Sequence, residues 1–248
     1  MANTIRVFVG TYTGGKSEGI YVYDPNGETG ALSYSSHIGG IDNPSFLVLS
    51  SDSRHLYAVS ETGDPGGKVF SYAIDPDSGA LTYLNDQLSH GSLPCSIDVD
   101  RSGSCVLVAN YGSGTISSYP VQRNGTLGEA VSKIQHEGSS IDESRQQEPH
   151  AHMIRHDLDY NYVFVPDLGM DKVMIYTLDP ATATLTAHDE ASVPPGSGPE
   201  NDTCLLLLLL GLLIVHWLAR RLPETAIPRL RSPFAHGSLV TPSWLARM

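Results

Sequence analysis

The chain has 248 residues, is 40% hydrophobic, and carries 15 basic against 27 acidic residues, a net charge of −12. The apolar content is enough for a buried core and excludes a wholly disordered chain, and the acidic balance argues against nucleic acid as the main partner. Three cysteines, none in a Cys-x-x-Cys spacing, exclude a disulfide framework. The lack of a disulfide framework, together with a polar N-terminal segment that has no secretory signal, leads us to expect a cytoplasmic protein.

The first predicted elements are three short strands within residues 5–13 and 20–37. Gly19-Ile-Tyr-Val-Tyr-Asp24 alternates β-branched or aromatic residues, and Gly30-Ala-Leu32 follows a turn. Similar pairs of phrases recur at 69–81, 116–127 and 173–185, and helical spacing is absent before Leu205. These segments therefore predict hairpins.

A second phrase begins at a proline and supplies two more strands in each copy. The copies start at Pro44, Pro94 and Pro149, steps of 50 and 55 residues, and another 50 residues lead to Pro199. A four-stranded unit repeating at about fifty residues is typical of a β-propeller blade. We predict an all-β fold with a first blade of three strands, which lacks its innermost strand, followed by three complete blades.

Five phrases within residues 5–199 together resemble the seven-bladed β-propeller lactonases. The phrases are Val9-Gly-Thr-Tyr-Thr13, Asn43-Pro-Ser-Phe46, Ala109-Asn-Tyr-Gly112, Glu148-Pro-His-Ala-His152 and Pro166-Asp-Leu-Gly169. This family includes the bacterial propeller-type 6-phosphogluconolactonases and the carboxymuconate-lactonising cycloisomerases. The resemblance implies that about four of seven blades are present, that a lactone site lies at one mouth of the central channel, and that no cofactor is needed.

The resemblance assigns the catalytic histidine to the Pro-His-x-His phrase, as His150 or His152. Because the two residues are two apart, strand alternation would place both rings on one side, with Glu148 as a nearby base or orienting group. A metal site at this His-x-His pair lacks a clear third ligand, so we predict none.

Three further polar residues are candidates for substrate binding: Asn43, Asn110 and Asp167. Each also has a structural interpretation. Asn43 precedes a proline and fits ordinary turn chemistry, and Asn110 ends a predicted strand where it could bond a neighbouring blade. Asp167 lies in a loop, where acids usually accept hydrogen bonds from backbone N–H groups.

The function predicted from the resemblance is hydrolysis of a sugar lactone, 6-phosphogluconolactone to 6-phosphogluconate, a step of the pentose phosphate pathway. The alternatives are a cycloisomerase acting on a carboxylated muconate and a non-catalytic propeller fragment that binds ligands. Where relatives have Gly-Pro-Arg-His, this chain reads Gly198-Pro199-Glu200, and a further glutamate and arginine of the family have no counterpart. We therefore expect impaired catalysis. The expected partner is a small-molecule sugar lactone, and the oligomeric state is not predicted.

The last 49 residues differ from the rest of the chain in composition and charge. Residues 1–199 carry a net charge of −14, whereas residues 200–248 contain five arginines, no lysine and three acids. Six consecutive leucines begin at Leu205, and the apolar stretch 203–219 reaches the lower limit for a membrane-spanning helix. A membrane would be a partner only if this stretch is such a helix. We favour a shifted reading frame after residue 199, because it explains the break inside the repeat and the altered composition together.

Overall fold

The computed structural model describes residues 5–63 and 66–200, and this part of the chain is all-β. Its fifteen strands form one three-stranded and three four-stranded antiparallel sheets, as predicted. Within the described residues, no helix has the length and apolar character needed to cross a bilayer. The predictions for the tail, a membrane helix at 203–219 or a shifted reading frame, fall outside the described residues.

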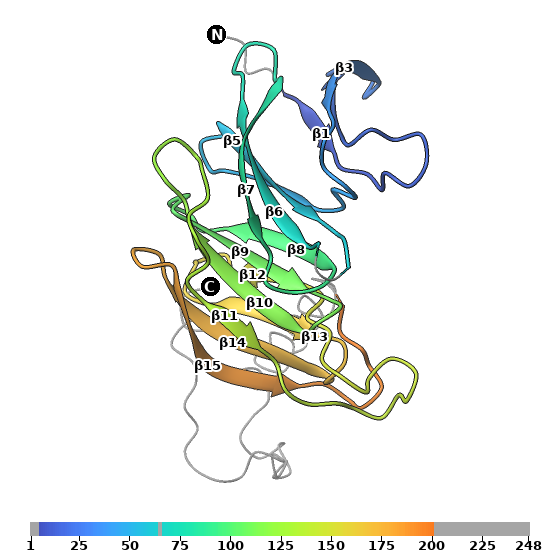
Figure 1. Ribbon diagram of the computed structural model, residues 1–248, viewed down its shortest axis with the longest axis vertical. Helices are drawn as coiled ribbons and strands as arrows, with labels where there is room; N and C mark the ends of the chain where they lie inside the picture. The colour runs from blue at the N-terminus through green and yellow to red at the C-terminus, as the bar shows by residue number, and fades with distance from the viewer. Residues whose placement is uncertain (1–4, 64–65, 201–248) are drawn as a thin grey trace, which may run out of the picture. The chain divides into compact units, whose positions relative to one another are not determined.

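Each sheet is a meander in which consecutive strands pair, and we call the sheets blades 1 to 4 (Figure 1). Blade 1 contains β1 (Val7–Val9), β2 (Ile20–Pro25) and β3 (Leu32–Ile38). Blade 2 contains β4 (Leu47–Leu49), β5 (His55–Ser60), β6 (Lys68–Ile74) and β7 (Leu81–Leu88). Blade 3 contains β8 (Pro94–Val99), β9 (Cys105–Asn110), β10 (Thr115–Pro120) and β11 (Lys133–Gln135). Blade 4 contains β12 (Arg155–His156), β13 (Val163–Asp167), β14 (Lys172–Asp179) and β15 (Thr184–Ser192).

The blades pack face to face through three apolar clusters, one between each consecutive pair. In β9, Val106 and Val108 face blade 2, whereas Leu107 and Ala109 face blade 4. All six residues of β9 are buried, because a strand in the middle of an inner blade is covered on both faces. This double burial explains why Cys-Val-Leu-Val-Ala reads as an uninterrupted apolar run rather than an alternation.

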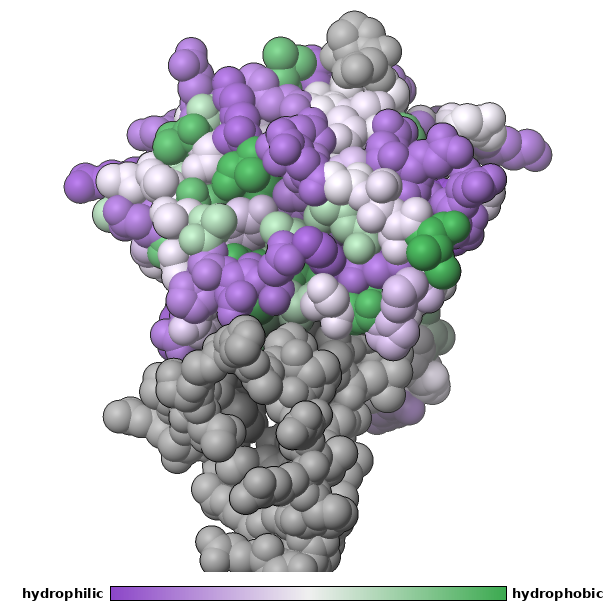
Figure 2. Space-filling view, turned by 90° about the horizontal axis from the view of Figure 1, so that it is seen from below, coloured by the Kyte–Doolittle hydropathy of each residue, from purple (hydrophilic) through white to green (hydrophobic). Residues whose placement is uncertain are grey.

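The outer strands and loops carry most of the polar surface. Residues of β3 and β15 are largely exposed, in contrast to those of β9. On the face shown in Figure 2, hydrophilic residues predominate and hydrophobic residues form small separate patches among them. The inner strands and the loops next to them are therefore the part of the fold in which a concave site is built.

The first strand of blade 4 is shorter than the repeat predicts. The strand β12 has only two residues, and the Pro-His-Ala-His phrase lies outside any strand, with a single bridge between Ala151 and Asp167. The prediction that the two histidines lie on a strand is therefore wrong. The Asp167 carboxylate accepts the His150 N–H at 2.8 Å and replaces a regular ladder bond, which interrupts the pairing.

Two glycines allow neighbouring backbone segments to approach each other closely. A Cβ on Gly169 would lie 1.9 Å from the Glu148 carbonyl oxygen, and one on Gly10 would lie 2.0 Å from that of Pro44. Both contacts are with backbone, which cannot move aside as the end of a side chain does. The segments that carry the two histidines and Asn43 are thus held against the neighbouring strand by residues without side chains.

Candidate active site

A cavity of about 350 Å³ lies where the inner parts of all four blades meet. It is lined by Tyr12, Ser45, Phe46, Glu61, Cys95, Tyr111, Arg145 and His152. Of the residues predicted to be functional, His152 contributes directly to this wall. The lining combines an imidazole, a guanidinium, a carboxylate and hydroxyls around one space, which is the assortment that acid–base chemistry on a polar substrate requires.

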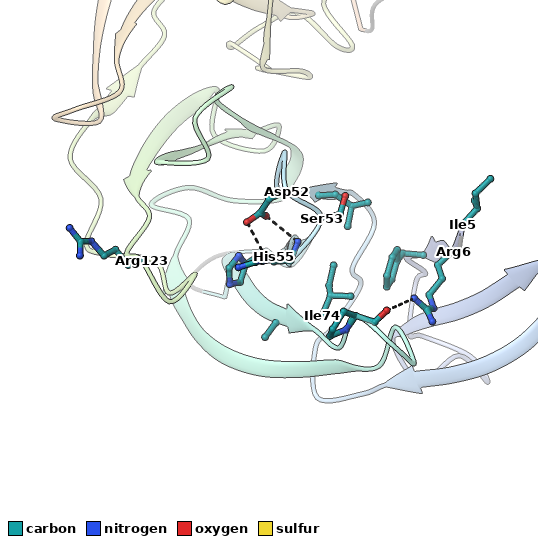
Figure 3. A pocket seen from close by; sticks show the side chains of 12 residues that line it. Ile5, Arg6, Asp52, Ser53, His55, Ile74 and Arg123 are labelled. Atoms are coloured by element: carbon teal, nitrogen blue, oxygen red, sulfur yellow. Dashed lines mark hydrogen bonds and ion pairs between the residues drawn. The ribbon is translucent and has the colours of Figure 1, made fainter. Parts of the chain in front are cut away.

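A larger cavity of about 830 Å³ contains none of the predicted site residues (Figure 3). Its charged side chains are mostly engaged with the protein: Arg6 donates to the Pro76 carbonyl at 3.2 Å, and Arg54 lies beside Asp52. Arg123 points away from the others in this view. These groups do not converge on one point, so the smaller cavity is the candidate active site.

The rings of His150 and His152 both contact Tyr111, but they are held differently. His150 stacks on the Tyr111 ring, with centroids 4.5 Å apart, and its Nδ1 donates to the Tyr111 carbonyl at 2.9 Å. His152 meets the same ring edge-on at 5.4 Å and lines the cavity, and its ring nitrogens form no hydrogen bond within the described residues. His152 is therefore free to bond a water or a substrate, whereas one nitrogen of His150 is occupied.

A buried network behind these histidines centres on Asp167, whose side chain has no exposed surface. Its Oδ2 accepts the Nδ1–H of His136 at 2.7 Å, and its Oδ1 accepts the N–H groups of His150 and Gly169. The Tyr176 hydroxyl bonds the other nitrogen of His136 at 3.0 Å. Since both Asp167 oxygens are occupied by the protein, the carboxylate fixes the histidine segment from behind and does not face the cavity.

The two asparagines predicted to bind substrate are also engaged within the fold. Asn110 is fully buried and donates to the Ser89 carbonyl of the neighbouring blade at 3.1 Å, which agrees with its structural interpretation. Asn43 accepts the Thr13 N–H at 3.0 Å and donates to the Glu61 carbonyl at 3.2 Å. Neither lines the cavity, and Asn43 instead joins two segments that do.

Glu148 lies away from the cavity wall, and the acid that lines it is Glu61. Glu148 is exposed, and its carboxylate forms no hydrogen bond with the described residues. Glu61 accepts the Tyr12 hydroxyl at 2.9 Å, and this hydrogen bond, with some burial, raises the pKa of Tyr12. Tyr12 thus keeps its proton at neutral pH, and the pair forms one polar side of the cavity.

Cys95 lines the cavity as a thiol. Burial raises its pKa to about 12, and its Sγ lies 3.2 Å from the His152 carbonyl oxygen. A thiol, unlike a thiolate, is a weak nucleophile. The protonated state of the thiol therefore favours attack by water over a covalent cysteine intermediate.

Arg145 reaches the cavity from the polar insertion 137–148, whose anchor is the neighbouring Gln146. Gln146 is buried and donates to the Leu168 carbonyl at 2.8 Å and to Asp171 at 2.9 Å. At the mouth, Arg145 forms a 3.0 Å ion pair with Glu200, and the Tyr111 hydroxyl and Glu200 both raise the pKa of the guanidinium.

Asp171 ties the insertion to the segment that carries Glu200. Its two oxygens accept four donors, the side chains of Gln146 and Ser140 and the backbone N–H groups of Gly196 and Gly198. Burial alone would raise the pKa of Asp171, but these hydrogen bonds outweigh it and lower the pKa. The ionised carboxylate is therefore the form that the fold requires.

Replacing Asp171 by Asn should lower the free energy of unfolding by about 2 kcal/mol at pH 7, because an amide NH₂ would face donors. The folded pKa lies below the unfolded value of about 3.9, so this stabilisation is present above about pH 4 and is lost as the pH falls through the folded pKa. Thermal melts of the two proteins should differ by about 4–8 °C at pH 7 and converge at acidic pH. The exposed variant Asp159→Asn is the control, and a gap that persists unchanged at low pH would contradict the prediction.

Of the eight residues of the cavity wall, only His152 was predicted as a site residue, and sequence reasoning missed the other seven: Tyr12, Ser45, Phe46, Glu61, Cys95, Tyr111 and Arg145. Four of these residues, Tyr12, Ser45, Phe46 and Tyr111, stand inside three of the five phrases that carry the family resemblance, and that position was the available signal. Arg145 lies in an insertion that reads as a solvated loop, and only the burial of its neighbour brings it to the cavity. Within residues 5–63 and 66–200, no group of three or more His, Cys, Asp or Glu side chains could hold a metal ion.

Comparison with known proteins agrees with this architecture. The sequence profile "Lactonase, 7-bladed beta-propeller" matches residues 6–201. The chain is 40% identical over 194 residues to the 6-phosphogluconolactonase of Bacillus subtilis, covering 78% of this chain and 54% of that protein. It is 32% identical over 200 residues to the 6-phosphogluconolactonase of Formosa agariphila, covering 79% and 57%.

A solved structure shows the same likeness in three dimensions. The periplasmic gluconolactonase of Pseudomonas aeruginosa superposes with a TM-score of 0.73 at 35% identity, over 79% of this chain and 57% of that one. The chain thus spans about half the length of the curated relatives that it matches. By its repeat, its blades and its sequence, the chain belongs to the seven-bladed β-propeller lactonase family.

Proposed function

We propose that the cavity is a lactone-hydrolysing site and that its substrate is a sugar δ-lactone, 6-phosphogluconolactone. The observation that carries the proposal is the His152 ring, which lines the cavity with both nitrogens free of the described residues. The names of the relatives support the substrate: two are 6-phosphogluconolactonases, and the structural neighbour is a gluconolactonase.

In the proposed reaction, His152 acts as the general base. It removes a proton from a water molecule as the water oxygen bonds to the lactone carbonyl carbon, and the carbonyl oxygen becomes an oxyanion. Tyr111 lines the same cavity, and its hydroxyl is a donor available to that oxyanion. The ring C–O bond then breaks, and the leaving oxygen takes the proton from His152. The product is the open-chain hydroxy acid, and the histidine returns to its starting state.

His150, Asp167 and Asn43 support this site without touching the substrate in the proposed arrangement. Asp167 holds the His150 backbone, His150 stacks on Tyr111, and Asn43 fixes the segment that carries Tyr12. The chain spans about half of each curated relative, and the family resemblance implies an arginine, a glutamate and a second arginine that have no counterpart in this sequence. We therefore expect slower turnover than in a full-length relative.

The test is hydrolysis of 6-phosphoglucono-δ-lactone by the purified 248-residue chain, followed as acid release against the spontaneous rate. We expect a rate above the spontaneous one that is proportional to protein concentration. Binding of 6-phosphogluconate without turnover would instead support a non-catalytic binding module. Turnover of a carboxylated muconate in place of the δ-lactone would support a cycloisomerase, and the absence of both binding and turnover would overturn the proposal.

A further inference from the structure

Among the described residues, Arg145 is the one guanidinium in the cavity wall, and the described part of the chain is strongly acidic. Residues 1–199 carry 10 basic against 24 acidic residues, so the chain as a whole repels anions. The wall itself also contains Glu61. An anionic ligand that enters this cavity therefore requires a local cation, and Arg145 is the permanently charged side chain that lines it.

The backbone of Arg145 is held in place by the buried side chain of its neighbour Gln146. Gln146, next to it, is 2% exposed and bonded to Leu168 and Asp171, while the Arg145 side chain is 54% exposed. The backbone is thus anchored, and the guanidinium remains accessible at the mouth. An arginine whose backbone is anchored and whose guanidinium is accessible to solvent is suited to binding a ligand.

The partner of Arg145 in this structure is Glu200, which approaches to 3.0 Å and is itself 39% exposed in its side chain. Asp171 holds both sides of this contact, since it bonds Gln146 on one side and the Gly196 and Gly198 N–H groups on the other. An exposed ion pair of this kind contributes little stability. A phosphate, with two negative charges and three oxygens, pairs with a guanidinium more strongly than one carboxylate does.

We propose that Arg145 is the specificity-determining residue that binds the phosphate of a phosphorylated sugar lactone, and that Glu200 competes with that phosphate for the guanidinium. This inference rests on the proposed lactone site and assigns recognition of the substrate's phosphate to Arg145. By the family resemblance, Glu200 stands where relatives have an arginine, and its ion pair partly neutralises Arg145, the one guanidinium that the described residues contribute to the cavity wall.

The first test compares 6-phosphoglucono-δ-lactone with glucono-δ-lactone as substrates of the wild type, Arg145→Gln and Arg145→Lys. Loss of a charged hydrogen bond should lower the ratio of kcat/KM values, phosphorylated over neutral, by about 10–100-fold in Arg145→Gln. Arg145→Lys keeps the charge but not the bidentate geometry and should fall between. Arg123→Gln, which lies on the larger cavity, is the matched control and should leave the ratio unchanged.

The second test measures binding, so that it stands even if the chain hydrolyses neither lactone. Calorimetric titration with 6-phosphogluconate and with gluconate should show tighter binding of the phosphorylated acid, and Arg145→Gln should abolish the difference. Glu200→Gln should tighten binding of 6-phosphogluconate by about two- to fivefold. The inference would be overturned if Arg145→Gln lost affinity equally for both ligands, or if the wild type bound both with equal affinity. Phosphate-selective binding without turnover would overturn only the hydrolytic proposal.

Discussion

Replacing His152 by Gln should lower kcat/KM for δ-lactone hydrolysis by about 10²-fold or more. General-base catalysis typically contributes about 10²–10⁴-fold, and glutamine cannot take up the proton of the attacking water. Glutamine has nearly the same reach and polarity, so the fold of the loop should be retained. The measurement is the initial rate of acid release, corrected for spontaneous hydrolysis, as a function of substrate concentration and pH.

The matched control is His150→Gln, two residues away. The His150 Nδ1 donates to the Tyr111 carbonyl, and a glutamine amide can donate as well, so we expect a loss of less than about tenfold. The rate of His150→Gln should therefore stay close to that of the wild type, whereas the rate of His152→Gln should not. If kcat/KM fell more in His150→Gln than in His152→Gln, His150 would be the general base and His152 the supporting residue.

Replacing Asp167 by Ala should lower the free energy of unfolding by about 3–5 kcal/mol. The change leaves His136 and the N–H groups of His150 and Gly169 without their acceptor in a site that is closed to solvent. Each buried donor that loses its acceptor typically costs about 1–3 kcal/mol, so the loss of three hydrogen bonds has a cost of this size. For a protein of this length, the expected fall in Tm is about 6–20 °C, measured by circular dichroism.

Two further variants separate the Asp167 network from a general effect of losing an acid. Asp167→Asn keeps an oxygen for His150 and Gly169, so we expect a smaller loss of about 1–3 kcal/mol. Asp189→Ala removes an exposed carboxylate of β15 and should shift Tm by less than about 2 °C. Equal melting temperatures for Asp167→Ala and Asp189→Ala would show that the network does not support the histidine segment.

The sequence by itself determined the architecture of the described residues. Prolines about fifty residues apart, hairpin phrases between them and Asp-Pro or Asn-Gly turns specify one three-stranded and three four-stranded sheets, and these are observed. The strands and turns could be predicted because strand alternation and turn chemistry are local properties of the sequence and recur in each copy of the repeat. The five family phrases also contribute to the wall of the candidate site, since His152 lines the cavity and Tyr12 and Tyr111 beside it belong to two of those phrases.

Only the tertiary structure decided which side chains face the cavity. Asp167 and Asn110 look like ligand-binding residues in sequence, yet both are fully buried and bonded to neighbouring segments. In the sequence, Arg145 looks like part of a solvated loop, yet the buried side chain of Gln146 anchors this loop so that Arg145 lines the cavity. Whether a polar side chain meets a ligand depends on which distant backbone groups lie opposite it. Those partners, such as Asp171 for Gln146 and Tyr111 for His150, are 25 and 39 residues away and meet only when the blades stack.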